Sequence, residues 1–222
     1  MGMKLLGVFI MKTKSLLVLG ITVLVSAGIN FAQEATTQDF VYSQNSQLTV
    51  VKMDSVGMVS KEEGAPPFLQ IFGDGRVQIH ESRERSFRAK GTYEMYLSEN
   101  EMQELLTSLY NIGLMEFDVQ ETKRKKTTAI RDRNKDSKDG EVSFRVVFDA
   151  ATIVIDLYLD SYRPPGSTDR PIRNFRKHIA WQGVHHDAQE YPEVPELTTL
   201  LQIQSALGTY SQSRDLVRIS NE

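Results

Sequence analysis

Three of the chain's four histidines lie close together, in the company of an aspartate. Imidazole and carboxylate groups are the usual ligands of catalytic zinc, and Glu190 or His80 could complete such a set. One hypothesis is therefore a metal-assisted hydrolase. Neighbouring side chains on an extended segment point in opposite directions, so the alternative is a polar loop beside Trp181. The cluster consists of His178, His185, His186 and Asp187.

A second group of side chains that could bind a ligand is a run of basic residues. Such a run favours an extracytoplasmic polyanion, for example an anionic lipid headgroup or an acidic polymer. No aromatic residue is interleaved to stack on bases, so nucleic acid is not expected. The alternative is a solvated polar loop over Thr122 to Gly140, in which Asp132, Asp136 and Asp139 offset the charge. The bases are Lys123, Arg124, Lys125 and Lys126, followed by Arg131, Arg133, Lys135 and Lys138.

Calcium binding is disfavoured within the same segment. Asp132, Asn134 and Asp136 have the spacing of the first three ligands of an EF-hand. The sixth position of that motif is Ser137 rather than Gly, and the twelfth is Ser143 rather than a bidentate Glu. The sequence therefore predicts no calcium loop here.

Covalent catalysis has little support in the sequence. There is no Gly-x-Ser-x-Gly motif, and the absence of cysteine removes thiolate nucleophiles and cysteine-ligated metals. Asp149, Asp156 and Asp160 lie on or near an expected hairpin, where Arg145 opposite Asp156 would form a structural ion pair. We expect no cofactor, and we favour a non-enzymatic module over an enzyme.

The N-terminus resembles a secretory signal peptide over residues 1–32. Lys12 and Lys14 precede an uncharged run from Leu16 to Ala27, and cleavage could follow Ala27 or Ala32. An uncleaved anchor is the alternative, and Met1 or Met11 could be the start. Without cysteine there is no lipid-attachment site. We predict a secreted or periplasmic protein with no stable transmembrane span after cleavage.

Cleavage after Ala32 would leave 190 of the 222 residues, enough for one domain. It would remove three of the 26 Lys and Arg residues, leaving 23 against 29 acidic residues and a net charge of −6. We expect a disordered leader over 33–47, one domain over 48–213 and a C-terminal tail over 214–222.

Hydrophobic patterning predicts an α+β domain: an antiparallel sheet of about five or six strands with two helices packed on one face. A first strand is expected over 48–51. Leu69 to Ile79 should form a hairpin whose three-residue loop, Gly73 to Gly75, pairs Ile71 with Val77. A strand from Tyr93 leads into a helix with a capping box at Ser98 and a left-handed Gly113 at its end.

The second half of the chain predicts a further hairpin and a closing helix. Alternation places Val142 to Phe148 against Ile153 to Leu159, with Phe148 opposite Ile153. A polar loop then runs from Ser161 to Asn174, and a last strand holds Ile179 and Trp181. A loop from Gly183 to Pro192 precedes a helix that starts at Pro195. Its buried stripe should comprise Leu197, Leu200, Ile203, Leu207 and Tyr210.

Several of these motifs together resemble a group of bacterial envelope domains with no established activity. The resemblance implies a strand, hairpin and helix in this order and an envelope location. Many members carry a lipid-anchoring cysteine, which this chain lacks. Partners implied by this location are an envelope protein or an anionic envelope component. The residues that carry it are Phe68–Phe72, Gly73-Asp74-Gly75, Val77–Ile79, Gly91, Leu97–Glu101, Gly113, Leu114 and Phe117.

Overall fold

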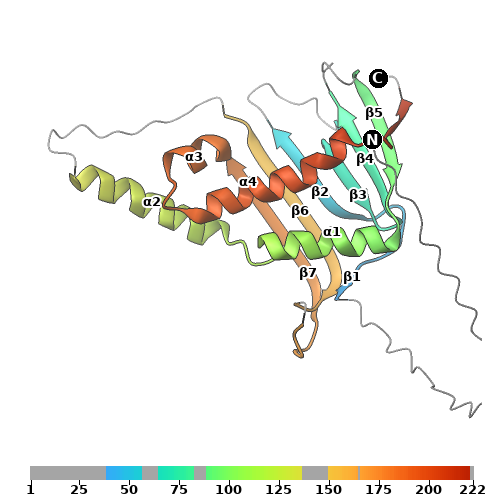
Figure 1. Cartoon of the computed structure of the whole chain (residues 1–222), viewed down its shortest axis with the longest axis horizontal. Helices are drawn as coiled ribbons and strands as arrows, with labels where there is room; N and C mark the ends of the chain where they lie inside the picture. The colour runs from blue at the N-terminus through green and yellow to red at the C-terminus, as the bar shows by residue number, and fades with distance from the viewer. Residues whose placement is uncertain (1–38, 57–64, 83–88, 137–149, 165, 221–222) are drawn as a thin grey trace, which may run out of the picture. The chain divides into compact units, whose positions relative to one another are not determined.

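The structure, a computed structural model, describes residues 39–56, 65–82, 89–136, 150–164 and 166–220 (Figure 1). All of them belong to the unit Thr37–Glu222. They form an α+β fold with an antiparallel sheet, as predicted. The strands are β1 Phe40–Val41, β2 Thr49–Val56, β3 Leu69–Phe72, β4 Arg76–Glu81, β5 Gly91–Tyr96, β6 Thr152–Tyr162, β7 Ile172–Gln182 and β8 Val217–Ser220. The helices are α1 Glu99–Ile112, α2 Val119–Asp136, α3 Val184–Glu190, α4 Pro195–Gly208 and the 3₁₀ turn η1 Thr209–Gln212.

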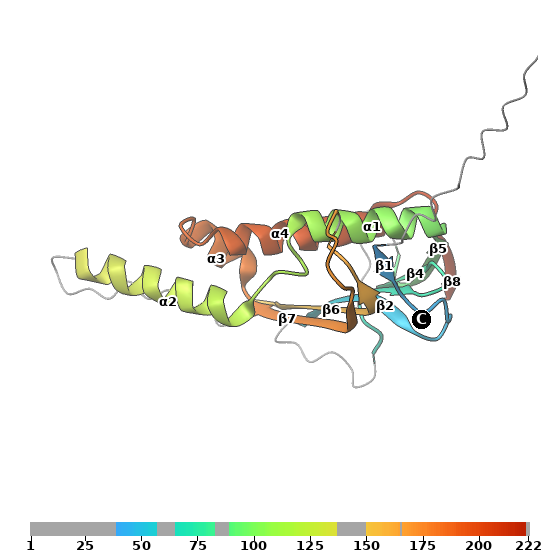
Figure 2. The same ribbon diagram turned by 90° about the horizontal axis from the view of Figure 1, so that it is seen from below.

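The eight strands form one sheet in the order β1-β6-β2-β3-β4-β5-β8, with β7 on the other edge of β6. Helices α1 and α4 lie side by side on one face of the sheet (Figure 2). The prediction of about five or six strands and two helices was too low. The short strands β1 and β8 lie in the expected leader and tail, and α2 and α3 replace expected loops.

Local sequence signals were read correctly at the β3–β4 hairpin and at α1. Ile71 pairs with Val77, and Gly75 adopts a left-handed φ of 83° that a side chain could not tolerate, because its Cβ would lie 2.1 Å from the Leu97 carbonyl oxygen. Ser98 and Glu101 form the predicted capping box, and Gly113 ends α1 with a φ of 107°.

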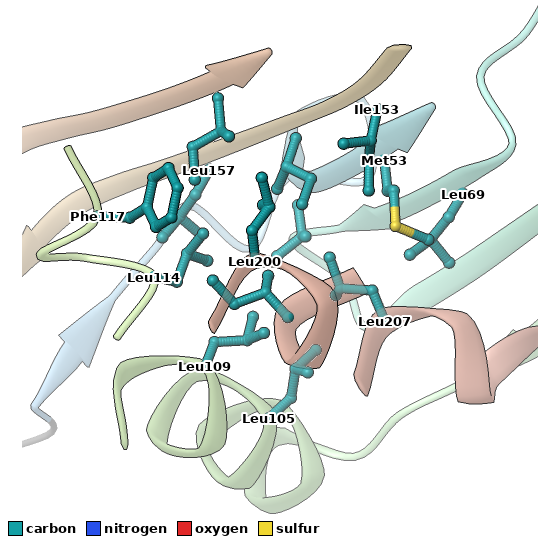
Figure 3. Packing of buried hydrophobic residues seen from close by; sticks show 14 of the residues in the cluster. Met53, Leu69, Leu105, Leu109, Leu114, Phe117, Ile153, Leu157, Leu200 and Leu207 are labelled. Atoms are coloured by element: carbon teal, nitrogen blue, oxygen red, sulfur yellow. The ribbon is translucent and has the colours of Figure 1, made fainter. Parts of the chain in front are cut away.

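The core lies between the sheet and the pair α1 and α4 (Figure 3). The inward residues of β6 alternate as predicted, and α4 starts at Pro195 and buries the predicted stripe apart from Tyr210, which lies half-buried in η1. Leucines of both helices meet aliphatic side chains of the strands, which excludes water from this face of the sheet. Residues in this layer include Leu105, Leu109, Leu200, Leu207, Met53, Leu69, Ile153 and Leu157.

The partner predicted for β6 was wrong. One edge of β6 pairs with β2 and β1, and the other pairs with β7 along its whole length, so neither edge is left for the predicted hairpin. An alternating strand fits any neighbour with the same pattern, and the pattern alone cannot exclude a partner about a hundred residues away. Residues 142–148, Arg145 among them, lie outside the described residues, as does the predicted signal peptide.

The predicted leader and tail contain strands. Phe40 is fully buried and stacks on Tyr162 with ring centroids 6.4 Å apart, which holds β1 against the end of β6. The segment expected as a disordered leader over 33–47 thus contains a short strand at Phe40–Val41. The tail pairs with β5 as β8. The loop expected over Ser161 to Asn174 is shorter, because β6 ends at Tyr162 and β7 begins at Ile172.

Candidate functional site

The β6–β7 pair presents different side chains to the two faces of the sheet. Ile155, Ile179 and Trp181 face the helices and are buried. The alternate residues Asp156 and His178 occupy the opposite, open face. Because successive side chains of a strand point to opposite sides, His178 and Trp181 lie on different faces of the same strand.

On this open face, Asp156 lies between two cross-strand partners. It pairs across the sheet with Lys52 of β2 on one side and with His178 of β7 on the other. Its carboxylate lies 3.1 Å from the Lys52 ammonium and 2.6 Å from Nδ1 of His178. Only 6% of Asp156 is exposed, whereas 66% of the His178 side chain is exposed. A buried carboxylate thus holds an exposed imidazole.

The hydrogen bond fixes the direction of the imidazole. An ionised carboxylate only accepts hydrogen bonds, so Nδ1 of His178 donates to Asp156 and Nε2 is directed away from it. In this orientation Nε2 could accept a hydrogen bond or a proton. Its same-face neighbours by register are Val154 and Tyr158 on β6, and Arg176 and Ala180 on β7. None of these four is a serine, threonine or carboxylate, so apart from the Tyr158 phenol the positions flanking His178 supply no nucleophilic or metal-binding oxygen.

An aromatic residue and an arginine continue the row. Tyr158 pairs with Arg176 across the strands, and the guanidinium carbon lies 5.6 Å from the tyrosine ring centroid. Tyr158 is 41% exposed. We call these five residues the open-face cluster: Lys52, Asp156, Tyr158, Arg176 and His178.

The predicted histidine cluster is divided by the sheet. The expected loop from Gly183 to Pro192 contains helix α3 instead, which places Asp187 on the helix-covered side. There Asp187 accepts a hydrogen bond of 2.8 Å from Nε1 of Trp181 and pairs with Lys126 at 2.6 Å. Since His178 lies on the other face, the two ends of the predicted set cannot bind one metal ion.

The remaining members of that set have separate partners. His186 lies 3.2 Å from Glu190 within α3, and His185 is exposed. His80 is buried on β4, where Nδ1 lies 3.3 Å from the Thr92 hydroxyl. Within the described ranges no group of three potential metal ligands is close enough to hold an ion.

The basic run is a helix rather than the predicted loop. The Asp118 carboxylate accepts hydrogen bonds from the backbone N–H groups of Gln120 and Glu121, at 2.8 and 2.9 Å, and so satisfies free donors at the start of α2. These bonds hold the Asp118 pKa below its ordinary value. Thr122 and Ala129 are buried in the contact with the rest of the fold.

Most of the predicted polyanion-binding residues form ion pairs with other residues of the chain. Arg124 pairs with Glu121, Lys125 with Glu196 of α4, and Lys126 with Asp187 of α3. Lys123 is exposed, and no partner for it is found among the described residues.

The second half of the basic run also contacts the segment between α3 and α4. Arg133 pairs with Glu193 at 2.8 Å. The charged groups of Lys126 and Arg133 lie 5.3 and 5.0 Å from the ring centroid of Tyr191, within the range of cation–π attraction. Asp132 pairs with Lys135 at 3.3 Å on the same helix, a geometry unlike a calcium loop. Lys138 lies outside the described residues.

Comparison with protein-family models, curated proteins and solved structures finds no match to the chain. Of the helices in the described part of the chain, none has the length and hydropathy to cross a bilayer.

Proposed function

We propose that the chain is an exported, non-enzymatic binding module that recognises a partner protein through the open-face cluster. The observation that carries this proposal is the exposed His178 imidazole held by the buried Asp156 carboxylate, beside the exposed Tyr158 and Arg176.

The residue types favour protein recognition. Tyrosine and arginine are enriched in the centres of protein interfaces and among the residues that dominate binding energy. Tyr158 and Arg176 lie on the paired strands β6 and β7, whose backbone hydrogen bonds hold the two side chains at a fixed spacing. A partner therefore meets a rigid row of polar and aromatic groups on β6 and β7.

The side chains are also pre-ordered. Binding normally costs about 0.5–1.5 kcal/mol for each flexible side chain that becomes fixed. Asp156 already fixes His178 and Lys52, and Tyr158 restrains Arg176. The partner would gain contacts with these groups without ordering them again. The strands pair through their backbones and do not need the Asp156 carboxylate. Its role in this proposal is to order His178 and Lys52 for binding.

A direct test uses site-specific photo-crosslinking in the native host. With p-benzoylphenylalanine in place of Tyr158, we expect one defined adduct. The same reagent in place of Gln189, which is exposed on α3, is the matched control and should not give this adduct. Combining Asp156→Asn with the crosslinker at position 158 should weaken the adduct, because His178 loses its orientation. Equal adducts at both positions, or none at Tyr158, would contradict the proposal.

Export is a separate part of the proposal and has its own test. The residues that support it are the two lysines and the uncharged run that follows them within residues 1–32. N-terminal sequencing of the protein recovered from the host should give Gly28 or Gln33 as the first residue. An intact N-terminus in the cytoplasmic fraction would contradict export and leave the binding proposal untouched.

A further inference from the structure

The basic residues of β7 differ from those of α2 in having few counter-charges. Residues 170–186 contain no aspartate or glutamate, and their Lys and Arg residues are Arg170, Arg173, Arg176 and Lys177. The three arginines are exposed, and no ion pair is found for them within the described ranges. We call these three residues the β7 arginine row. The row carries positive charge on a chain whose net charge is −3.

Lys177 differs from the arginines because it has a partner inside the fold. Its Nζ donates a hydrogen bond of 2.8 Å to the carbonyl oxygen of Phe117, just before the start of α2. Lys177 therefore holds this segment against β7 and is not available to a ligand.

The nearest carboxylates in the sequence do not neutralise the β7 arginine row. Asp160 is exposed on β6, and the Asp169 carboxylate accepts a hydrogen bond of 3.0 Å from the Ser167 hydroxyl. In the described part of the chain, neither aspartate forms an ion pair with the row. Each guanidinium has five N–H donors in a planar arrangement, so the row offers donors for which the fold supplies few acceptors.

The β7 arginine row leads directly into the open-face cluster, to which Arg176 also belongs. Arg173 and Arg176 are three residues apart on one strand, a separation of about 10 Å along the chain. The Arg176 guanidinium carbon lies 5.6 Å from the ring centroid of Tyr158. Both arginines lie between the middle of β7 and the hairpin loop that joins it to β6 (Figure 1). A partner that contacts Tyr158 therefore lies close to the row.

We infer that the partner of the open-face cluster presents a carboxylate-rich segment to the β7 arginine row. This inference rests on the proposed function and adds the chemistry of the partner. A guanidinium donates two parallel hydrogen bonds to one carboxylate, a geometry that a lysine ammonium does not offer. Complementary charges of this kind raise the association rate and exclude partners of the wrong sign.

An acidic protein segment fits the row better than an anionic lipid surface. Polybasic segments that bind anionic membranes contain clusters of about four to eight basic residues, and the row has fewer. Arginine beside tyrosine is instead the composition of protein interfaces. Arg176 and Tyr158 supply this combination where the row meets the open-face cluster.

Titration of the nitrogen-15-labelled protein with an acetylated oligoglutamate peptide tests the inference without the native partner. We expect the side-chain Nε–H signals of Arg173 and Arg176 to shift. The shifts should shrink as salt is raised from about 0.1 M to about 1 M, over which the screening length falls from about 10 Å to about 3 Å. An oligoglutamine peptide of the same length is the matched probe and should cause no shifts.

Charge reversal locates the site. Arg173→Glu should weaken oligoglutamate binding at least about threefold, because it removes one ion pair and adds a repulsive charge. Arg131→Glu is the matched control, since it makes the same charge change at an exposed arginine of α2, and its effect should be much smaller. Urea denaturation should show both variants folded, because both side chains are exposed.

The crosslinker at position 158 gives the corresponding result with the native partner. Arg173→Glu should reduce the adduct at least about threefold, whereas Arg131→Glu should leave it unchanged. An adduct that is insensitive to Arg173→Glu would overturn the inference while the proposed function stands. Oligoglutamate binding at β7 without any adduct at Tyr158 would contradict the proposed function and keep the carboxylate-binding site. Equal effects of the two reversals, or binding to phosphatidylglycerol vesicles but not to oligoglutamate, would also overturn the inference.

Discussion

Two aspartates of this molecule are almost equally buried but have different roles. Asp187 is 7% exposed and Asp156 is 6% exposed, and each contacts one lysine and one aromatic or imidazole N–H group. Their partners differ in exposure. Trp181 is 4% exposed, whereas 66% of the His178 side chain is exposed. The carboxylates are comparable, but only one of them presents its partner to solvent.

The elements that the two aspartates join explain this difference. Asp187 connects α3 to the Trp181 side chain of β7, six residues earlier, and to Lys126 of α2, which is distant in sequence. Asp156 connects β2, β6 and β7, which are already joined by backbone hydrogen bonds. Removal of the first carboxylate leaves buried donors without a partner, whereas the donors around the second can be solvated by water. We conclude that Asp187 stabilises the fold and Asp156 positions a surface side chain.

The largest expected effect comes from neutralising each aspartate in turn. Asp187→Asn should lower the free energy of unfolding by about 3 kcal/mol, because it leaves Lys126 partly buried without a counter-charge. Asp156→Asn should cost about 1 kcal/mol, since 38% of the Lys52 side chain and 66% of the His178 side chain are accessible to water. Urea denaturation of both variants checks the difference. Equal losses would remove the distinction between the two sites.

Neutralising the two lysines should give a smaller effect in the same order. Lys126→Met should cost about 1–2 kcal/mol, since Asp187 loses its counter-charge and the Tyr191 ring loses one of its two cations. Lys52→Met should change stability by less than about 0.5 kcal/mol. Methionine replaces the apolar part of the lysine side chain without its ammonium group, so packing of that part is matched at both positions. If Lys52→Met were the more damaging change, Asp156 would be the structural site.

The sequence predicted best where the signal was local. The turn at Gly73 to Gly75, the capping box at Ser98 and the stripe of α4 depend on residues within a few positions of each other. Local geometry and hydrophobic periodicity determine such features, whatever the rest of the chain does. Because these elements were predicted correctly, the position of the core was predicted correctly as well.

The features that the sequence did not predict depend on residues whose partners are distant in the sequence. Helix α2 was read as a loop because Lys126 and Arg133 stand where its inward stripe should be apolar. Their counter-charges are Asp187 and Glu193, about sixty residues later, which no local pattern reveals. The candidate site was missed for a similar reason. Asp156 was assigned to Arg145, because the register that brings it to His178 depends on the β6–β7 pairing.

Acid should weaken the attachment of α2 through the Lys125–Glu196 pair. Burial raises the pKa of Glu196, but the hydrogen bond from Lys125, a backbone hydrogen bond and the charge of Lys125 together lower the pKa below the ordinary 4.5. The Glu196 contribution to stability is therefore complete above pH 4.5 and is lost as the pH falls through the lower folded-state pKa. The difference in unfolding free energy between wild type and Glu196→Gln should shrink over that window.

A control separates this effect from general acid denaturation. Lys125→Met removes the partner of Glu196. In that background Glu196→Gln should give a smaller change over the same pH range, because the Lys125 interactions that lower the Glu196 pKa are absent. If the Glu196→Gln difference were flat in the wild-type background, Lys125 and Glu196 would not be a stabilising pair.

A similarly small effect on stability is expected for His178→Gln. The imidazole is largely exposed and its strand is held by neighbouring strands, so the unfolding free energy should change by no more than about 0.5 kcal/mol. The same variant should nevertheless lose most of the adduct expected from the crosslinker at position 158. A loss of several kcal/mol would show that His178 supports the fold rather than presenting a surface.

The orientation of His178 can be measured without any partner. Nitrogen-15 chemical shifts of the imidazole distinguish the two neutral tautomers, and the Asp156 carboxylate requires the proton on Nδ1. In Asp156→Asn the amide can donate or accept, so the preference for Nδ1 should weaken while the sheet stays intact. Asp187→Asn, on the other face of β7, is the matched control and should leave the His178 tautomer unchanged wherever the variant is folded. A tautomer with the proton on Nε2 in the wild type would contradict the assigned hydrogen bond and, with it, the role given to Asp156.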